Sequence, residues 1–294
     1  MGVLQNEDPL VVRPKRKSVL SFLEHDFKTV EVERAEPFDD WVKPLLDETL
    51  EKPNRVFWYP PRKNFRGSMV GDECVRSLTL TLFGHNVPLK AHTLRIFRVG
   101  RKVEEGIVED LASSGTIVNT QEVLTYENPP ILGKSDIVIK DPNSETVLLG
   151  EIKSINSKGF GYLPKEHGLT LASESPLFKT KQGYVRQWNI YANAPGKEHE
   201  EGFLLFEEKD LHKQKIFYLR RDKDLFNEDI EHMRTAWDYF TGSEPMVAPI
   251  PFDRNPTSSS DKVCKWCDKK YLCLSIGEDS VPIKTVKKID KGLR

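Results

Sequence analysis

The chain has 294 residues, of which 38% are hydrophobic and 30% are charged, so it is long enough to bury a substantial core. Its formal net charge of -1 excludes a uniformly basic protein, and any contact with nucleic acid must use local patches. No apolar run approaches the roughly 20 residues of a membrane span, and residues 1–10 lack a signal-peptide pattern. We therefore predict a soluble, cytoplasmic protein that binds no membrane.

The first segment, residues 1–60, is rich in charged residues and is interrupted by prolines that break any long periodic element. It predicts an N-terminal extension with short helices over residues 18–27 and 38–50. Basic residues cluster near the start and again over the last stretch, and each cluster fits a solvated tail or an arm that contacts nucleic acid. These residues are Arg13, Lys15, Arg16, Lys17, Lys284, Lys287, Lys288, Lys291 and Arg294.

The central segment begins with a helical pattern. Over residues 95–112, apolar side chains recur at three- and four-residue spacing, which predicts an amphipathic helix with this face in the core; they are Ile96, Val99, Val103, Ile107 and Leu111. Gly115 follows this helix as a C-cap glycine would. Strand-like runs come next at residues 116–119, 122–126, 135–140 and 146–155, the last two joined by a turn.

The later elements alternate in the same way. We predict a helix over residues 179–192, strands over 202–207 and 215–219, and a helix over 225–240 whose core face carries Ile230, Met233, Trp237 and Phe240. A flexible linker at residues 256–260 then leads to a cysteine segment. The order predicts an α/β fold with a mixed β-sheet core flanked by helices. We divide the chain into an extension (1–60), one main domain (61–275) and a basic tail (276–294).

A candidate catalytic centre lies on two consecutive predicted strands. Asp136 begins the first strand, and Glu151 and Lys153 lie on the second, on one face because side chains alternate along a strand. Carboxylates that hold Mg²⁺ or Mn²⁺, with a lysine that orients or deprotonates water, suit phosphodiester hydrolysis. Taken alone, the pattern is more often a solvated strand face with an ion pair. The apolar surroundings of Glu151 and the acids on the upstream helix favour a metal site.

The four cysteines are unevenly spaced: Cys264, Cys267 and Cys273 are bunched, and Cys74 stands alone far upstream. If the three neighbouring thiols formed disulfides with one another, one of them would stay unpaired. A metal or cluster site, in contrast, uses four thiolates. We therefore predict one four-cysteine site. Zinc uses the same ligands, so the residues leave iron–sulfur and zinc open.

In this order the motifs resemble the RecB-like branch of the PD-(D/E)XK nuclease superfamily, particularly the CRISPR-associated and phage-encoded exonucleases with an iron–sulfur cluster. The resemblance covers most of the chain, from about Arg66 to Cys273, and the combination is far more specific than any single motif. The matching motifs are Arg66-Gly-Ser with Cys74 and Arg76, Arg95-Ile-Phe-x-x-Gly100-x-x-x-Glu104, Gly133-x-x-Asp136, Gly150-Glu-Ile-Lys-Ser154, Gln187-x-x-x-Tyr191 and Cys264-x-x-Cys267-x5-Cys273.

The resemblance implies a restriction-endonuclease-like fold for this chain, and it also implies which residues form the active site. It implies Asp136 and Glu151 as metal ligands, Lys153 as the catalytic lysine, and Gln187 and Tyr191 in the active cleft, where plain helix packing otherwise explains them. It also implies a 4Fe-4S cluster that closes the domain, held by Cys74, Cys264, Cys267 and Cys273.

The third metal ligand is where this chain departs from the family. Many relatives carry a histidine near the first motif, but here Arg101 follows Gly100, and the nearest histidine is His92. The ligand is then Glu104 or Glu105, and the spacing from the glycine favours Glu104. The other histidines show no convergent motif.

The function that the resemblance implies is metal-dependent DNA exonuclease activity on single strands or DNA ends, in DNA processing, recombination, phage replication or spacer acquisition. Such a nuclease could form a homo-oligomer or bind partner proteins of recombination or CRISPR systems. A phage origin of the gene is also compatible with this function. Two other hypotheses are a non-catalytic DNA-end-binding subunit, against which the intact Asp136, Glu151 and Lys153 argue, and a zinc-stapled RNA-processing nuclease, for which no RNA-binding module is seen. The sequence decides neither the polarity of cleavage nor whether the enzyme acts as an endonuclease or an exonuclease.

Overall fold

The computed structural model describes residues 41–294. The chain divides into the units Met1–Lys43 and Pro44–Arg294, and the second contains the sheets and the core. The predicted helix over residues 18–27 and the first basic cluster lie outside the described residues. The helix predicted over 38–50 is present from Val42 onward, as α1 (Val42–Glu51). No helix in the described part of the chain is both long and apolar enough to cross a membrane.

The main sheet has six strands in the order β2-β5-β6-β8-β9-β7. β5 and β6 form an antiparallel hairpin, β6 pairs in parallel with β8, and β8 and β9 are antiparallel again. The sheet is therefore mixed, as the sequence predicted. Its strands are β2 (Ile117–Thr120), β5 (Ile137–Lys140), β6 (Val147–Ile155), β7 (Thr170–Leu171), β8 (Glu201–Glu208) and β9 (Gln214–Arg220).

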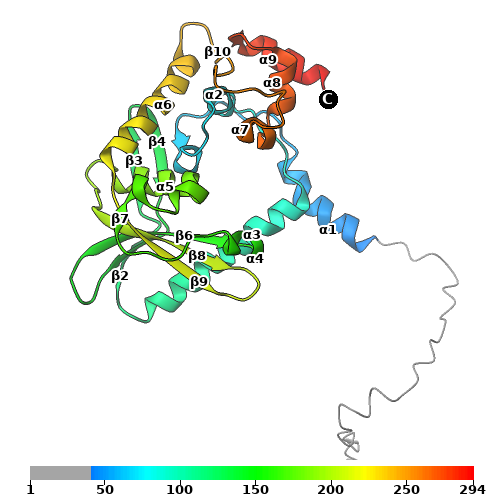
Figure 1. Cartoon of the computed structure of the whole chain (residues 1–294). Helices are drawn as coiled ribbons and strands as arrows, with labels where there is room; N and C mark the ends of the chain where they lie inside the picture. Colours follow the sequence, from blue (N-terminus) through cyan, green and yellow to red (C-terminus); the bar gives the residue numbers. More distant parts are fainter. Residues whose placement is uncertain (1–40) are drawn as a thin grey trace, which may run out of the picture. The chain divides into compact units, whose positions relative to one another are not determined.

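Helices cover both faces of this sheet (Figure 1). On one face, α3 (Ala91–Ala112) buries Val103 and Ile107 against β5, β6 and β8, in a core that includes Ile152. On the other, α5 (Phe178–Ala192) and α6 (Lys223–Thr241) enclose the larger core. The predicted core face of α6 is confirmed, because Ile230 and Met233 are buried and the two aromatic residues pack against them.

The predicted apolar face of α3 is only half buried. Ile96 is 49% exposed and Val99 is 42% exposed. The first turns of α3 are held beside α1 rather than over the sheet, since Arg95 pairs with Asp47 and the Ala91 amide donates to Glu51. The prediction was therefore wrong for the first part of the helix. The helix ends at Ala112, and Gly115 adopts φ +69°, in agreement with the predicted glycine stop.

A second sheet, β1-β4-β3, contains two strands that the sequence did not predict, β1 and β4. β4 lies between β1, to which it is parallel, and β3, to which it is antiparallel. Pro130 at its start and Gly133 inside it weaken the usual strand pattern. The strands of this sheet are β1 (Phe65–Arg66), β3 (Val123–Glu127) and β4 (Pro130–Lys134).

The short helices in this part of the chain are η2 (Lys52–Asn54), η3 (Gly67–Met69), α2 (Val75–Leu82), α4 (Ser157–Gly161) and η4 (Ala172–Glu174).

The last segment folds onto α2 instead of forming a tail. α9 (Ile283–Gly292) buries Val286 completely, and its Asp290 accepts a hydrogen bond of 2.7 Å from Trp58 Nε1. The segment is therefore folded and is not a free tail, although its basic side chains, from Lys284 to Arg294, are exposed as a solvated surface would be. The domain boundaries at 60 and 275 stay predictions. The other elements here are β10 (Met246–Val247), α7 (Lys262–Trp266), α8 (Lys270–Ile276) and β11 (Val281–Pro282). Residues 256–260 form no helix or strand, as expected of a linker.

Candidate active site

The predicted acid and lysine on β6 do share one face of the sheet. Lys153 Nζ donates to Glu151 Oε1 at 2.5 Å. Ile152, between them, points to the opposite face and joins the core under α3. Glu151 is only 2% exposed, and burial of a carboxylate is costly unless neighbouring groups compensate for it.

Asp136 is brought beside this pair by the β5–β6 hairpin. Its neighbour Ile137 pairs with Gly150 across the ladder, which sets Asp136 opposite Glu151 and Ile152. Asp136 Oδ2 accepts a hydrogen bond of 2.7 Å from the Ile152 amide. The two acids are therefore placed by strand register rather than by a flexible loop.

Helix α5 supplies the third side of the site. Gln187 Nε2 donates to Glu151 Oε1 at 2.7 Å, and Gln187 Oε1 lies 3.4 Å from Lys153 Nζ. One turn later, the Tyr191 hydroxyl accepts from Gln187 Nε2 at 3.2 Å. The i and i+4 spacing thus puts the amide and the phenol on one helix face, as predicted, and that face meets the carboxylate centre.

Two glycines of the predicted motifs make room for Tyr191. A Cβ atom on Gly67 or on Gly133 would lie 2.2 Å from the Tyr191 ring, which is a severe overlap. Both residues must therefore lack a side chain if the phenol is to reach Gln187. This contact explains, in physical terms, why Arg66-Gly-Ser and Gly133-x-x-Asp136 belong to the same constellation.

The structure places Glu104, and not Glu105, next to this centre. Glu104 is partly buried, and burial raises its pKa, with a further contribution from Asp136. Its Oε1 accepts a hydrogen bond of 2.7 Å from Gln121 Nε2. Glu105 is exposed and pairs with Lys102 at 2.5 Å.

Burial raises the pKa of each acid in this site, and neighbouring carboxylates add to the shift of Glu151 and Glu104. Burial, followed by the charges of Asp136 and Glu104, raises the pKa of Glu151 to about 8 even though Lys153 opposes the shift. Burial also raises the pKa of Asp136, and the pKa of Lys153 is raised because Glu151 and Asp136 outweigh the effect of burial. Glu151 Oε2 is buried without a hydrogen-bond partner. The ionised forms of these acids are therefore disfavoured in the absence of a cation, and a bound cation would favour them.

Each of the three acids accepts a hydrogen bond from a protein donor through one oxygen, whereas Glu151 Oε2 has no partner. In the described part of the chain, no three Asp, Glu, His or Cys side chains are placed so that they can hold a metal ion together. The donor chemistry nevertheless fits a hard divalent cation, since it consists of carboxylate oxygens and one of them lacks a partner.

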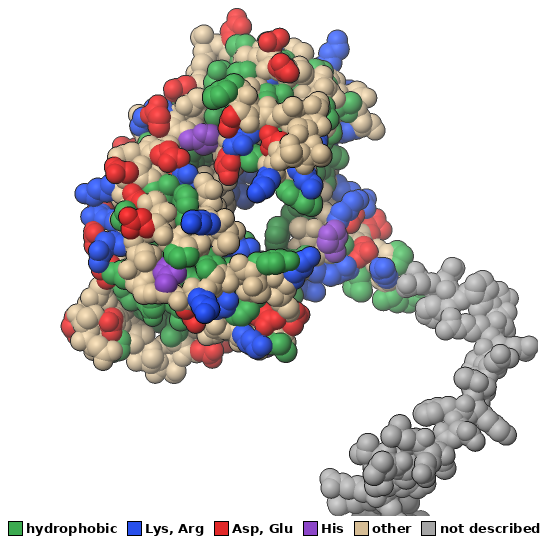
Figure 2. Space-filling view, viewed as in Figure 1, with side chains coloured by type: hydrophobic (Ala, Val, Ile, Leu, Met, Phe, Trp, Pro, Cys, Tyr) green, Lys and Arg blue, Asp and Glu red, His purple; other side chains and the backbone are tan. Residues whose placement is uncertain are grey.

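An open cleft of about 510 Å³ reaches the centre at Gln187. It lies between the η3–α2 segment and the start of α5, where Lys181 breaks the helical conformation with φ −139° and ψ 41°. Ser68, Lys181 and Tyr184 line the cleft. Ser68 belongs to the Arg66-Gly-Ser motif, whereas no sequence pattern pointed to Lys181, because a kink inside a helix depends on its tertiary neighbours. Figure 2 shows Lys and Arg side chains around a hollow on the viewed face of the molecule.

The four cysteines form a second group, at the junction of α2 with the C-terminal segment. Cys74 immediately precedes α2, Cys264 lies in α7, Cys267 follows α7 and Cys273 lies in α8, and all four are free thiols. Burial, with added repulsion from neighbouring thiols, raises the pKa of Cys74 to about 11 and that of Cys273 to about 12. The thiols are thus neighbours, but they do not have the geometry of a metal cluster.

Arg76 holds this junction together from within α2. Its guanidinium is completely buried and donates to the carbonyl oxygens of Ala248, Gly277, Glu278 and Asp279, at 2.6 to 3.1 Å. It also lowers the pKa of Cys273 against the effect of burial. Arg76 therefore fastens the cysteine-bearing segment to α2 and places a positive charge beside the thiols.

No protein-family model matches the chain, and no curated protein matches it in sequence. Among solved structures it is similar to LHK-Exo in complex with dAMP (16% identity, 60% of this chain and 86% of the other, TM-score 0.41). It is similar to the alkaline exonuclease LHK-Exo of Laribacter hongkongensis (14%, 65% and 90%, TM-score 0.41) and to SSO0001 (14%, 79% and 94%, TM-score 0.42). At these scores the similarities decide neither activity nor substrate.

Proposed function

We propose that this protein is a divalent-metal-dependent nuclease that hydrolyses phosphodiester bonds in DNA. The observation that carries the proposal is Glu151, a buried carboxylate with one oxygen held by Lys153 and Gln187 and the other without a partner. The charges of Asp136 and Glu104 act on it and raise its pKa. A buried carboxylate whose pKa is shifted by neighbouring acids and a lysine, beside an open cleft, supports a catalytic role.

The roles follow from these contacts. When bound by Asp136, Glu151 and Glu104, a divalent cation would supply an activated water and neutralise charge on the phosphate. Lys153 holds Glu151 Oε1 and offers a proton donor next to the carboxylates. Gln187, steadied by Tyr191, fixes the same oxygen from the other side. Lys153 and Gln187 therefore leave one oxygen of Glu151 for the cation.

We propose DNA, and an end or a single strand in particular, as the substrate. The cleft beside Gln187 is open, and Lys and Arg side chains surround a hollow on one face although the whole chain carries a net charge of -1. A local basic rim of this kind suits a phosphodiester backbone. Exonuclease action and a place in DNA processing or recombination belong to this proposal.

The direct test uses anaerobically purified full-length protein with end-labelled single- and double-stranded DNA, in Mg²⁺, in Mn²⁺ or in EDTA. We expect cleavage with either metal and none in EDTA. A closed circular single strand in parallel separates exonuclease from endonuclease action. Binding of DNA ends without cleavage in any metal would favour the non-catalytic subunit, and cleavage confined to RNA would favour the RNA-processing alternative.

Metal binding should be visible in the stability of the fold. The unfolded chain loses the Glu151 proton near the ordinary glutamate pKa of 4.5, but the folded chain loses it only near 8, so stability falls as pH rises between these values. A bound cation favours the carboxylate and offsets this loss. We expect Mg²⁺ or Mn²⁺ to raise the melting temperature more at pH 8 than at pH 6. If Glu151→Gln shows the same metal-induced increase, the cation binds elsewhere.

Gln187 should matter for turnover more than for folding. Gln187→Ala removes the donor that fixes Glu151 Oε1, and we expect cleavage to fall by roughly a hundredfold because small misplacements of catalytic groups have effects of that size. Gln182→Ala is the matched control, since Gln182 lines the same cleft but has no contact with Glu151. A lower melting temperature with unchanged turnover would show that Gln187 only packs.

We further propose that Cys74, Cys264, Cys267 and Cys273 bind one 4Fe-4S cluster. Support comes from four buried or partly buried thiols from distant parts of the chain that influence one another's pKa, with the Arg76 guanidinium beside them. Thiolates are the ligands that such clusters use, and a nearby positive charge stabilises them. Zinc is the alternative with the same ligands.

A further inference from the structure

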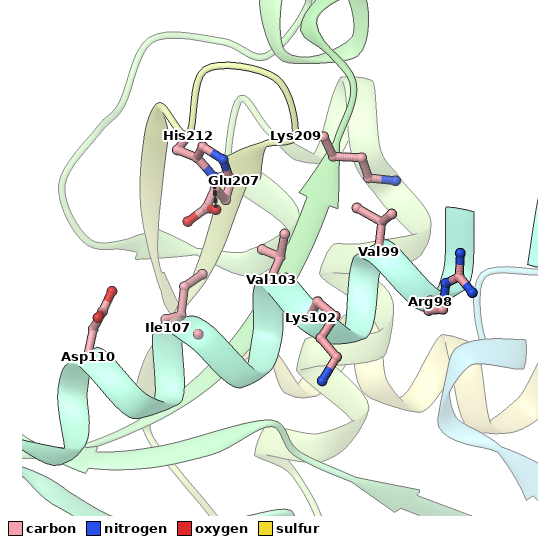
Figure 3. A pocket seen from close by; sticks show the side chains of 10 residues that line it. Arg98, Val99, Lys102, Val103, Ile107, Asp110, Glu207, Lys209 and His212 are labelled. Carbon is pink, nitrogen blue, oxygen red and sulfur yellow. Dashed lines mark hydrogen bonds and ion pairs between the residues drawn. The ribbon is translucent and has the colours of Figure 1, made fainter. Parts of the chain in front are cut away.

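The helices α3 and α5, which cover opposite faces of the main sheet, are held in different ways. α3 is one unbroken helix that buries Val103 and Ile107 against the strands, whereas Val99, nearer its start, borders an open groove of about 550 Å³ (Figure 3). α5 is interrupted at Lys181, where the backbone leaves the helical conformation. Hydrogen bonds along α5 therefore do not by themselves fix the direction of the part that carries Gln187, and side-chain contacts must do so.

Arg186 is the side chain that spans this interruption. Its guanidinium lies over the ring of Phe178, 5.4 Å from the ring centroid, and Phe178 precedes the break in the helix. The same guanidinium forms an ion pair with Asp229 of α6 through Nη1, and Nη2 donates to Glu228 at 2.8 Å. One side chain thus joins both parts of α5 to α6.

The inner ion pair, between Arg186 and Asp229, is buried. The Arg186 side chain is 12% exposed and that of Asp229 is 3% exposed, whereas Glu228 is largely exposed and its pairing is of the weak kind. Because both charges give up water to form it, a buried pair often adds little stability over apolar residues of the same size. A charge-assisted hydrogen bond is, however, short and restricted in angle. The pair therefore fixes how α5 lies against α6.

Gln187 is the next residue along α5, and it points toward the sheet. Its Nε2 donates to Glu151 Oε1 at 2.7 Å. Successive side chains of a helix are only roughly 100° apart around its axis, so they turn together as one body. A rotation of α5 that moves Arg186 away from Asp229 therefore moves Gln187 relative to Glu151.

We propose that Arg186, held by Asp229, is a positioning residue for the reaction assigned to Glu151, and that it acts through Gln187 rather than on the reacting groups. This inference rests on the proposed nuclease function and deepens it. Gln182 is also a neighbour of the guanidinium, since its amide oxygen accepts from Arg186 Nε at 3.0 Å when it is turned toward it. Both residues belong to α5, so that contact does not join α5 to α6.

The test replaces both partners at once, so that no buried charge is left alone. In Arg186→Met/Asp229→Leu we expect kcat for DNA cleavage in saturating Mg²⁺ to fall by about tenfold and KM to change by less than about twofold, because a small displacement of a catalytic group slows turnover by this order. Asp229→Asn, which keeps the shape and removes the charge, should also lower kcat. Burial raises the pKa of Asp229 to about 7 although Arg186 opposes the shift, so the assay is run at pH 8. Glu231→Gln is the control and should leave kcat unchanged, since Glu231 is an exposed acid of α6 that pairs with Arg234 within the helix.

A double-mutant comparison with Gln187→Ala separates positioning from a structural role. If Arg186 acts through Gln187, the paired change should cause no further loss of kcat in the Gln187→Ala protein, because the group that it positions is already absent. A further loss of about tenfold there would overturn the proposal. A paired variant with the kcat of the wild type would also overturn it, whether or not its melting temperature is lower. Absence of cleavage by the wild-type protein would instead overturn the proposed function itself, which distinguishes the two failures.

Discussion

Glu151→Gln should reduce DNA cleavage by more than about a hundredfold, the size of effect seen when a general acid–base or electrostatic group is removed. The fold should survive the change. Burial already raises the pKa of Glu151 to about 8, so at neutral pH without a cation the side chain is mostly protonated and an amide resembles it. Initial cleavage rates with saturating Mg²⁺, together with melting curves in EDTA, measure both effects.

Lys153→Ala should cause a loss of the same order for a different reason. The Lys153 ammonium group donates to Glu151, and the charge of Asp136 helps to raise its pKa. Its removal therefore takes away a proton donor and the positive charge next to the carboxylates. Loss of activity with unchanged DNA affinity would separate catalysis from binding. Cleavage that survives both Glu151→Gln and Lys153→Ala would move the active site elsewhere.

The two neighbouring acids of α3 provide a matched pair for the same assay. Glu104→Gln should impair cleavage, because Glu104 lies in the field of Asp136 and Lys153. Glu105→Gln should not, since Glu105 is exposed and paired with Lys102. Equal effects would show that the helix contributes general charge rather than a specific ligand.

Cys74→Ala should yield insoluble or protease-sensitive protein, and each of Cys264, Cys267 and Cys273 should be equally necessary. A cluster on these four residues would link Cys74 to the C-terminal cysteines and so close a loop that contains most of the domain. By analogy with a disulfide over a loop of that length, the denatured state alone would lose on the order of 5 kcal/mol of entropy. That rivals the stability of a typical domain.

The measurement is iron, sulfide and zinc content of anaerobically purified protein, with visible absorbance and limited proteolysis of each variant. We expect brown protein that contains iron and sulfide. Ser275→Ala, an exposed change on α8 that leaves the thiols in place, is the control. Colourless protein with one zinc would reassign the site to zinc. A folded, metal-free quadruple variant would show that Arg76 and the apolar contacts of α9 hold the segment without any metal.

Local pattern was sufficient for the long elements. α3, α5, α6 and the strands of the main sheet other than β7 lie within a few residues of their predicted positions, because an amphipathic helix and a buried strand each repeat a simple period. The same alternation correctly set Glu151 and Lys153 on one face. The element β4 was missed because proline and glycine obscured its pattern. The helix α9 was missed because its many lysines concealed the stripe of Ile283, Val286 and Ile289.

Sequence pattern was enough to establish the mixed α/β class, the pairing of acid and lysine on β6, and the helix face that carries Gln187 and Tyr191, since these depend only on backbone periodicity. Packing between distant segments decided which helix acid meets Asp136, why Gly67 and Gly133 must be glycine beside the Tyr191 ring, and that Arg76 ties the two ends of the domain together. It also decided that Val99 faces a groove and not the core. These outcomes depend on residues far apart in the chain, where a displacement of a few ångströms changes the partner and no local pattern records it.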